Sequence, residues 1–236
     1  KKKPTLIILS KMDLANKELT NRWVKHFEDN GNIAIACNIP TLSYQEVKKK
    51  CQVVLKDKIE KDLAKGLRQR PVRALVVGIP NVGKSTFINK MASRKATQTG
   101  NRPGVTTASQ YIKIDKDFVL LDTPGVLWPN FEDKNVGVNL ALIGSIKQTI
   151  LPLEEVVEAL IRKLTTLYPG TLKEHYGIEE IEINDVKDIA ETINRVGISR
   201  NFLLNNKEVD TERTIIHMLR EFANGKIGKF TLEEPK

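Results

Sequence analysis

The residues best suited to chemistry lie in one run, Gly78-Ile79-Pro80-Asn81-Val82-Gly83-Lys84-Ser85. This run fits the pattern G-x-x-x-x-G-K-[ST] of phosphate-binding loops. Glycines let main-chain N–H groups wrap a phosphate without a clash from Cβ, and a helix that follows directs its positive end at the anion. The Lys84 ammonium would lie on the β- and γ-phosphates, and the Ser85 hydroxyl would be a ligand of Mg²⁺. We therefore predict that this run binds a nucleotide.

A second candidate segment, Leu120-Leu121-Asp122-Thr123-Pro124-Gly125, follows about forty residues later. Asp122 ends a predicted strand, where its carboxylate could hold Mg²⁺ through water. The N–H of Gly125 could bind the γ-phosphate. A lone D-x-x-G is often only a turn, but a strand followed by D-T-P-G behind a phosphate-binding loop indicates a nucleotide switch.

Residues 94–107 between these motifs resemble a mobile loop, because they include Gly100, Pro103 and Gly104. A threonine on this loop, Thr106 or Thr107, could complete the Mg²⁺ shell and sense the γ-phosphate. Such a loop orders with GTP and relaxes after hydrolysis. The alternative is a solvated threonine pair in a turn. The candidate Mg²⁺ ligands are Ser85, Asp122 and Thr107, with Thr106 as the alternative threonine.

The segment most able to choose the base precedes the phosphate loop. Ser10-Lys11-Met12-Asp13 follows the predicted strand 6–9 and resembles N-K-x-D, in which the carboxylate accepts the guanine N1 and N2 hydrogens and the lysine stem covers the ring. Serine in place of asparagine is a departure, because a hydroxyl reaches less far than a carboxamide. The alternative is that Asp13 only caps a helix. Downstream, Asn206 to Asp210 has one residue too many, and Asp210 is more typical of a helix N-cap.

The motif order is therefore base, phosphate loop, switch and D-T-P-G. We predict strands over 6–9, 33–37, 72–77, 110–114 and 118–121, and helices over 18–30, from 44 toward 66 and from 85. This alternation predicts an α/β, doubly wound, mostly parallel sheet. Such a sheet tolerates a circular permutation, because chain ends lie at the surface and often near each other.

The pattern changes after residue 150, where apolar residues recur at helical spacing over 156–167 and 215–222. We therefore predict two domains: a nucleotide-binding domain over 1–150 and a small all-helical C-terminal domain over 151–236. Residues 1–150 carry 26 Lys/Arg against 13 Asp/Glu, whereas residues 151–236 carry 12 against 16. A basic half favours a polyanionic partner such as RNA.

Composition and cysteine content exclude several classes of protein. The 236 residues are 40% hydrophobic and 28% charged, which is typical of a globular protein, and no apolar run approaches the roughly 20 residues that cross a bilayer. Two cysteines, Cys37 and Cys51, cannot form a disulfide framework or a four-ligand metal site, which favours the cytoplasm. The abrupt start at Lys1 leads us to expect further residues upstream.

Four segments together resemble the circularly permuted GTPases of ribosome assembly, and within them the ribosome biogenesis GTPase A family. They are Gly78 to Thr86, Arg102 to Thr107, Leu121 to Pro129, and Gly225 to Phe230. The resemblance covers nearly the whole chain. It implies GTP hydrolysis in late maturation of the large ribosomal subunit, with its precursor, rRNA and ribosomal proteins as partners, and an RNA-binding helical C-terminal domain. We expect a monomer.

The resemblance also assigns roles to further residues. Thr86 belongs to the phosphate loop, and Cys37 and Asn38 fall where a second base-contacting loop lies. Val126 occupies the position after D-T-P-G at which other GTPases carry a water-orienting glutamine. The family instead uses K⁺ near Asn81 in place of an arginine finger, and an upstream segment with a histidine. We accordingly expect slow intrinsic hydrolysis, with Lys84, Asn81 and Thr107 acting in the reaction and ribosomes stimulating it.

Two other functions remain open from the residues alone. One is a small-molecule kinase in which S-K-M-D is coincidental, although no arginine-rich lid is visible. The other is an RNA-binding scaffold that does not hydrolyse nucleotide. The presence of Lys84, Ser85 and Asp122 argues against a scaffold.

Overall fold

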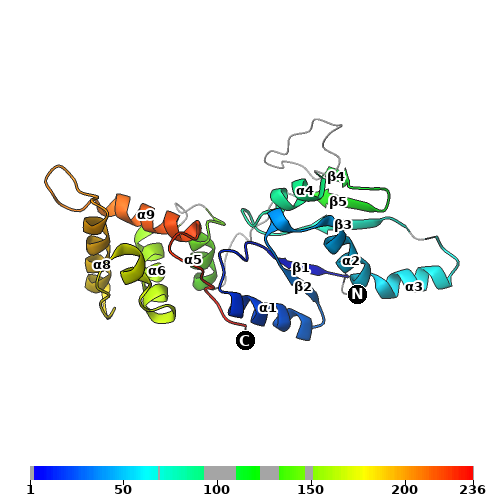
Figure 1. The fold of residues 1–236 in the computed structure, drawn as a ribbon, viewed down its shortest axis with the longest axis horizontal. Helices are drawn as coiled ribbons and strands as arrows, with labels where there is room; N and C mark the ends of the chain where they lie inside the picture. Colours follow the sequence, from blue (N-terminus) through cyan, green and yellow to red (C-terminus); the bar gives the residue numbers. More distant parts are fainter. Residues whose placement is uncertain (1–2, 69, 93–109, 123–132, 147–150, 236) are drawn as a thin grey trace. The chain divides into compact units, whose positions relative to one another are not determined.

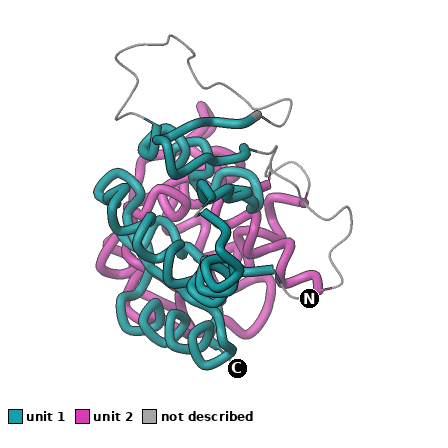
Figure 2. Tube along the Cα trace, turned by 90° about the vertical axis from the view of Figure 1, so that its right-hand side faces the viewer, with its two compact units in different colours: residues 1–128, 233–236 teal, residues 129–232 magenta. Residues whose placement is uncertain are grey.

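The computed structural model describes residues 3–68, 70–92, 110–122, 133–146 and 151–235. The chain divides into two compact units, which Figure 2 colours separately: Lys1–Trp128 with Glu233–Lys236, and Pro129–Leu232. The division thus falls after Trp128, whereas the sequence led us to expect a boundary at residue 150. Three predicted site residues, Thr106, Thr107 and Gly125, lie outside the described residues.

The strands of the first unit confirm the α/β class (Figure 1). β1 (Leu6–Leu9) pairs in parallel with β2 (Ile33–Ala36). β3 (Val72–Val76) pairs in parallel with β5 (Phe118–Asp122), and β4 (Gln110–Lys113) runs antiparallel to β5. Among the described residues the strands form two hydrogen-bonded groups, β1-β2 and β3-β5-β4. Within both groups the parallel strands end at segments predicted to bind the nucleotide.

Side-chain capping explains where the helices of the first unit begin. α1 (Lys17–Asp29) begins after Asn16, whose side chain accepts the Leu19 N–H. α2 (Tyr44–Val54) begins after Ser43, which accepts the Glu46 N–H. The helix expected from 44 toward 66 is in fact two, because the chain turns at Leu55 before α3 (Lys56–Ala64). The remaining helical elements are η1 (Ile39–Thr41) and α4 (Lys84–Ala92).

One apolar core holds these elements together. Alternate residues of β5 are buried, and Phe118 and Leu120 pack with Phe87 and Met91 of α4. The same cluster includes Ile39 of η1 together with residues of β2 and α2. The core therefore fixes the carboxyl ends of the strands relative to α4 and η1, which is what a site built at those ends requires.

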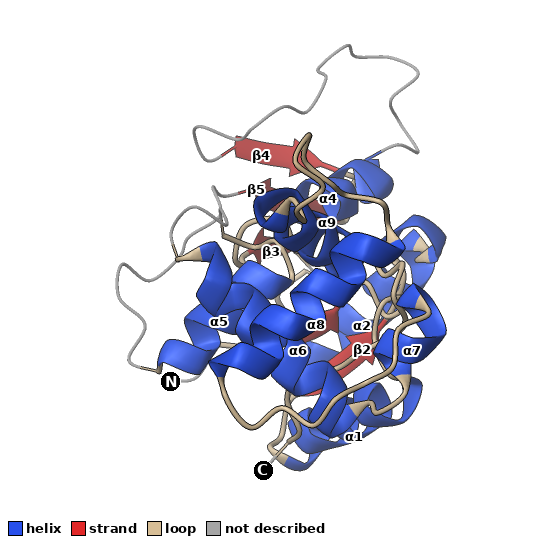
Figure 3. Ribbon diagram, turned by 90° about the vertical axis from the view of Figure 1, so that its left-hand side faces the viewer, coloured by secondary structure: helices blue, strands red, loops and turns tan. Residues whose placement is uncertain are grey.

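The second unit is helical, as its apolar spacing predicts (Figure 3). It contains α5 (Lys134–Leu142), α6 (Leu153–Leu167), α7 (Thr171–Tyr176), α8 (Val186–Ser199) and α9 (Thr211–Ala223). The described part of this unit has no strand beyond an isolated bridge between Leu203 and Val209. Val157 and Leu160 of α6 and Met218 and Leu219 of α9 are fully buried. Asp210 caps α9 by accepting the Arg213 N–H, which confirms the interpretation of that segment.

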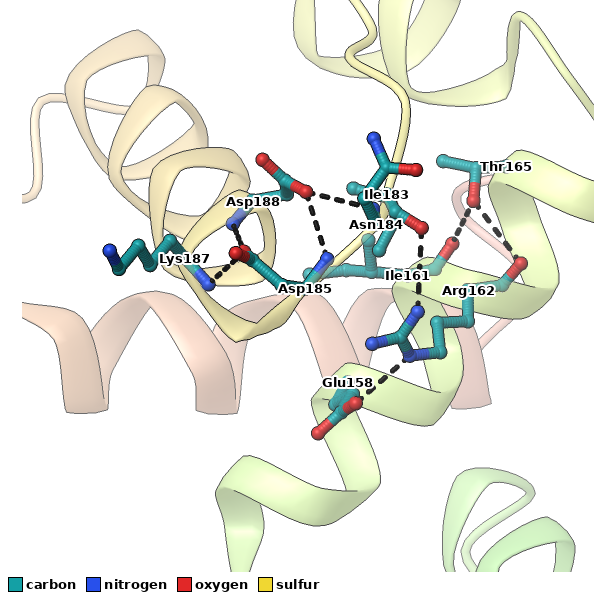
Figure 4. Close-up of polar contacts among 9 residues, drawn as sticks. All are labelled: Glu158, Ile161, Arg162, Thr165, Ile183, Asn184, Asp185, Lys187 and Asp188. Carbon is teal, nitrogen blue, oxygen red and sulfur yellow. Dashed lines mark hydrogen bonds and ion pairs between the residues drawn. The ribbon is translucent and has the colours of Figure 1, made fainter.

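Polar contacts fix the start of α8 against α6 (Figure 4). Asp185 and Asp188 form a capping box, and Asp188 Oδ2 also accepts the Asn184 N–H at 2.8 Å. Arg162 donates to Glu158 on its own helix at 2.9 Å and to the Ile183 carbonyl before α8 at 3.5 Å. Arg162 thus pairs with Glu158, Asp185 and Asp188 accept main-chain N–H groups, and these contacts serve the packing of the helices.

Candidate nucleotide-binding site

The phosphate loop joins β3 to α4, the connection that its motif requires. Asn81 adopts the left-handed conformation with a φ of 60°, which asparagine tolerates better than most residues. Gly83 has a φ of 96°, and a Cβ at this position would lie 2.8 Å from Ile39 Cδ1. Glycine is therefore required here both by the backbone and by the space. Such a turn before a helix exposes successive N–H groups, which form a concavity for anions.

Lys84 places its ammonium group inside this turn. Its Nζ donates to the Ile79 carbonyl oxygen at 2.6 Å. Burial lowers the pKa of Lys84, and the nearby Asp122 carboxylate acts in the opposite direction. A partly desolvated cation within a loop of main-chain N–H groups is suited to phosphate oxygens, because electrostatic attraction is stronger where water is excluded.

Three further predicted residues lie at the same end of the first unit. Ser85 and Thr86 are exposed in the first turn of α4. Asp122, the last residue of β5, is 4% exposed, and β5 pairs with β3 so that Val76 faces Asp122 in the register. The end of β5 is thus beside the strand that leads into the phosphate loop. Within the described residues no group of three His, Cys, Asp or Glu side chains could hold a metal ion.

The S-K-M-D segment contacts the phosphate loop directly. Ser10 Oγ donates to the Val82 carbonyl oxygen at 2.7 Å, although the two residues are 72 positions apart. The serine that departs from the usual asparagine is therefore a tether between the two motifs. A hydroxyl is sufficient for this contact, because only one donated hydrogen bond is needed.

Asp13 lies in an exposed turn between β1 and α1. The turn is closed by Leu14 N–H, which donates to the Lys11 carbonyl at 2.9 Å, and Lys11 has a positive φ of 56°. The alternative that Asp13 caps the following helix is wrong, since Asn16 caps α1. Lys11 and Asp13 are thus exposed and free of a capping duty, as a base-reading pair requires.

The second base-loop candidate follows β2. The Cys37 N–H donates to the Leu9 carbonyl at 2.9 Å, which joins this segment to the end of β1. Because that N–H is already bonded, Asn38 is the better of the two candidates for a main-chain contact to a base. Burial, the larger effect, and Glu46 both raise the pKa of Cys37.

The structure also reveals residues that the sequence did not single out. Ile39 covers Gly83 and thereby sets the packing between η1 and the phosphate loop. The Ile79 carbonyl receives the Lys84 ammonium. Neither residue has a distinctive side chain for this role. The only signal in the sequence was the position of Ile39 just after the predicted strand 33–37.

Comparisons with known proteins agree with this geometry. The family model described as 50S ribosome-binding GTPase matches residues 73–227, and the model described as RsgA GTPase matches residues 1–132. Ribosome biogenesis GTPase A of Bacillus cereus is 45% identical over 99% of this chain and 78% of its own length. The protein of that name from Thermotoga maritima is 30% identical over 100% of this chain and 78% of its own length.

Solved structures give the same relationship. A GDP-bound structure of TM YlqF aligns with a TM-score of 0.68 and 25% identity, covering 98% of this chain and 83% of that chain. A GNP-bound YlqF from T. maritima gives the same score and identity and is covered over 82% of its chain. The likeness extends over both units, and the relatives match the segment that carries S-K-M-D as well as the phosphate loop. This chain belongs to the ribosome biogenesis GTPase A family of circularly permuted GTPases.

Proposed function

We propose that this protein binds and hydrolyses GTP as a switch in the late assembly of the large ribosomal subunit. One observation carries the proposal: the 2.7 Å hydrogen bond from Ser10 Oγ to the Val82 carbonyl. It brings the segment that we propose to read guanine against the loop that we propose to bind phosphate, although the former comes first in the chain. A base-reading segment of a permuted GTPase would have to lie beside the phosphate loop in this way.

Each candidate residue then has a role in the site. Lys11 and Asp13 would bind the guanine ring, with Ser10 positioning them and with Cys37 and Asn38 bordering the base. The phosphates would be held by the main chain of the loop and the hydroxyls beside it, namely Asn81, Val82, Gly83, Lys84, Ser85 and Thr86. Gly125, Thr106 and Thr107 would respond to the γ-phosphate. Lys84 would stabilise the charge that develops on the phosphoryl oxygens during hydrolysis.

The donor set fits Mg²⁺. Magnesium prefers oxygen ligands and is usually held by one or two carboxylates together with the oxygens of a phosphate. Ser85 offers a hydroxyl and Asp122 a carboxylate at the end of the strand beside the phosphate loop, and Thr107 is the third candidate. When bound, the ion would neutralise charge between the β- and γ-phosphates.

The assembly role follows from the relatives, which are named for ribosome biogenesis. On this basis we propose the large-subunit precursor, rRNA and ribosomal proteins as partners, the helical unit as one ribosomal contact, a monomeric state and a cytoplasmic location. In the described residues, no helix is long and apolar enough to span a membrane.

The test measures nucleotide choice and ribosome dependence on one preparation. The protein should bind GTP and GDP far more tightly than ATP, sediment with large ribosomal subunits, and turn over GTP on the order of 10⁻⁴ to 10⁻² per second alone. Added large subunits should accelerate turnover. Equal affinity for ATP would favour a kinase, and GTP binding without hydrolysis under any of these conditions would favour a scaffold.

Potassium dependence gives a sharper prediction about Asn81. Its left-handed backbone holds it on the phosphate loop, and an amide oxygen is a hard ligand suited to alkali cations. A cation there would supply the charge that an arginine finger supplies in other GTPases. We expect GTP turnover to be several-fold faster in KCl than in NaCl or choline chloride at equal ionic strength. The nucleotide affinity of the parent is also measured in each salt.

The matched variant is Asn81→Gly, because glycine keeps the left-handed backbone and removes only the amide. It should bind GTP and lose the advantage of KCl. If Asn81 merely stabilises the turn, the glycine variant will keep its preference for potassium. Equal rates of the parent in all three salts, with the full-length protein, would also contradict the prediction.

A further inference from the structure

α3 is a helix without a buried side. None of its residues is buried, and Figure 1 shows it at the outer edge of the first unit, beyond α2. Leu63 is 53% exposed, and Val53 at the end of α2 is 52% exposed. An isolated helix of this length is marginal in water, since helices shorter than about 12–15 residues rarely form without packing. Packing within the first unit therefore stabilises this helix little, which is typical of a segment that acts through a partner.

Its lysines lie in a row. Lys58 and Lys61 of α3 and Lys65, the C-cap residue that follows it, are spaced three and four residues apart, and residues at these spacings are neighbours on one helix face. The row is about 10 Å long, given a rise of about 1.5 Å per residue. By the same spacing, Leu55, Ile59 and Leu63 fall on another face. Asp62 lies beside this row, four residues after Lys58 and three before Lys65, and Asp57 lies four residues before Lys61, whereas Glu60 falls on another face.

The lysine row forms no ion pair within the described part of the chain. All three lysines are exposed, and the ion pairs found among the described residues do not include them. Lys48 on α2 is different, because it binds Asp115 at 3.1 Å and helps to anchor α2 to the turn between β4 and β5. α2 is therefore fixed to the core, whereas the cations of α3 remain open to solvent.

The surrounding sequence extends this positive charge. Residues 44–70 contain nine Lys/Arg and four Asp/Glu. The helical unit over 129–232 has thirteen Lys/Arg and sixteen Asp/Glu, and several of its cations are paired, such as Arg162 with Glu158 and Arg195 with Glu191. On charge alone, a polyanion is attracted to the first unit more than to the second.

We propose that α3 is an RNA-docking arm, whose row of Lys58, Lys61 and Lys65 binds the phosphate backbone of an RNA duplex. Phosphates follow each other about every 3.4 Å along the axis on each strand of B-form DNA, and an RNA duplex carries them at least as densely, so a row of this length can face about three phosphates. The contact is electrostatic and independent of sequence, because the row offers ammonium groups and no side chain that reads a base edge. This inference rests on the proposed function, since it places part of the rRNA contact on the GTPase unit.

The test uses the triple variant Lys58/Lys61/Lys65→Gln, because glutamine keeps the length and the helix propensity of the side chain. Binding of a fluorescent RNA hairpin with a stem of about 16 base pairs is measured from low to high salt. We expect affinity to fall about tenfold or more near physiological salt, and the slope of log affinity against log salt to decrease by about 2 to 3. GTP affinity, measured on the same preparation, should not change.

The matched control is Lys17/Lys25/Lys116→Gln, which removes three exposed lysines from other parts of the same unit. Unchanged hairpin binding by the α3 variant, or an equal loss in the control, would refute the docking arm. Two further results would also refute it. In the first, Lys226/Lys229→Gln loses all hairpin binding while the α3 variant loses none. In the second, the parent binds vesicles rich in anionic lipid but does not bind the hairpin. In each case GTP binding by the parent would leave the proposed GTPase function standing, whereas its absence would refute that function instead.

Discussion

Replacing Lys84 with alanine should reduce GTP turnover by about 10²- to 10³-fold, the loss typical of removing one group that stabilises transition-state charge. The physical reason is the position of the ammonium group, which lies inside the phosphate loop and donates to the Ile79 carbonyl. Burial already lowers the pKa of this lysine, so its cation is partly desolvated before any phosphate arrives. Single-turnover hydrolysis, with GTP affinity measured separately, gives the size of the effect.

The control for this variant is Lys116→Ala, which removes an exposed lysine from the turn between β4 and β5. It loses the same charge but should hydrolyse GTP like the parent. A Lys84→Ala protein that keeps the parent rate would show that the run from Gly78 to Ser85 is only a strand–helix turn. Circular dichroism of both variants would exclude unfolding as the cause.

The sequence could predict the parts of the site that rest on local chemistry. The phosphate loop needs glycine and lysine types in fixed positions, and the structure places Gly83 where a side chain would meet Ile39. Helix caps are equally local, so Ser43 and Asp210 were predictable as the residues before α2 and α9. The apolar spacing after residue 150 similarly predicted the helical character of the second unit.

The parts that depend on contacts between distant residues could not be predicted. The bond from Ser10 to Val82 depends on how β1 and β3 lie in the folded unit, and no spacing in the chain reveals it. The break at Leu55 was also missed, because no glycine, proline or other stop signal stands near residue 55. Tyr44 and Lys48 bind Asp115 across the unit, which fixes α2 and leaves α3 to extend beyond it.

The Asp115 carboxylate shows how such a distant contact changes chemistry. The hydrogen bond from the Tyr44 hydroxyl, the largest effect, lowers the pKa of Asp115 to about 2, with further help from the Asp117 N–H and Lys48. In the sequence alone, the turn Asp115-Lys116-Asp117 gives no sign of this effect. Its partners come from α2, about seventy residues earlier, and only the fold brings them together.

Asp13→Asn should change which base the protein prefers. The exposed Asp13 would accept the N1 and N2 hydrogens of guanine, and an amide in its place offers a donor where guanine needs an acceptor. Loss of this charge-assisted pair suggests about 1.5–3 kcal/mol, on the order of a tenfold or greater decrease in GTP affinity. XTP carries an oxygen at C2, which needs a donor, so the variant should gain affinity for XTP.

Competition binding of GTP and XTP to both proteins measures this change of preference. The matched control is Asp117→Asn, which changes an exposed aspartate of the β4–β5 turn. A variant that binds GTP like the parent, or that loses GTP without gaining XTP, would show that the carboxylate of Asp13 does not read the base.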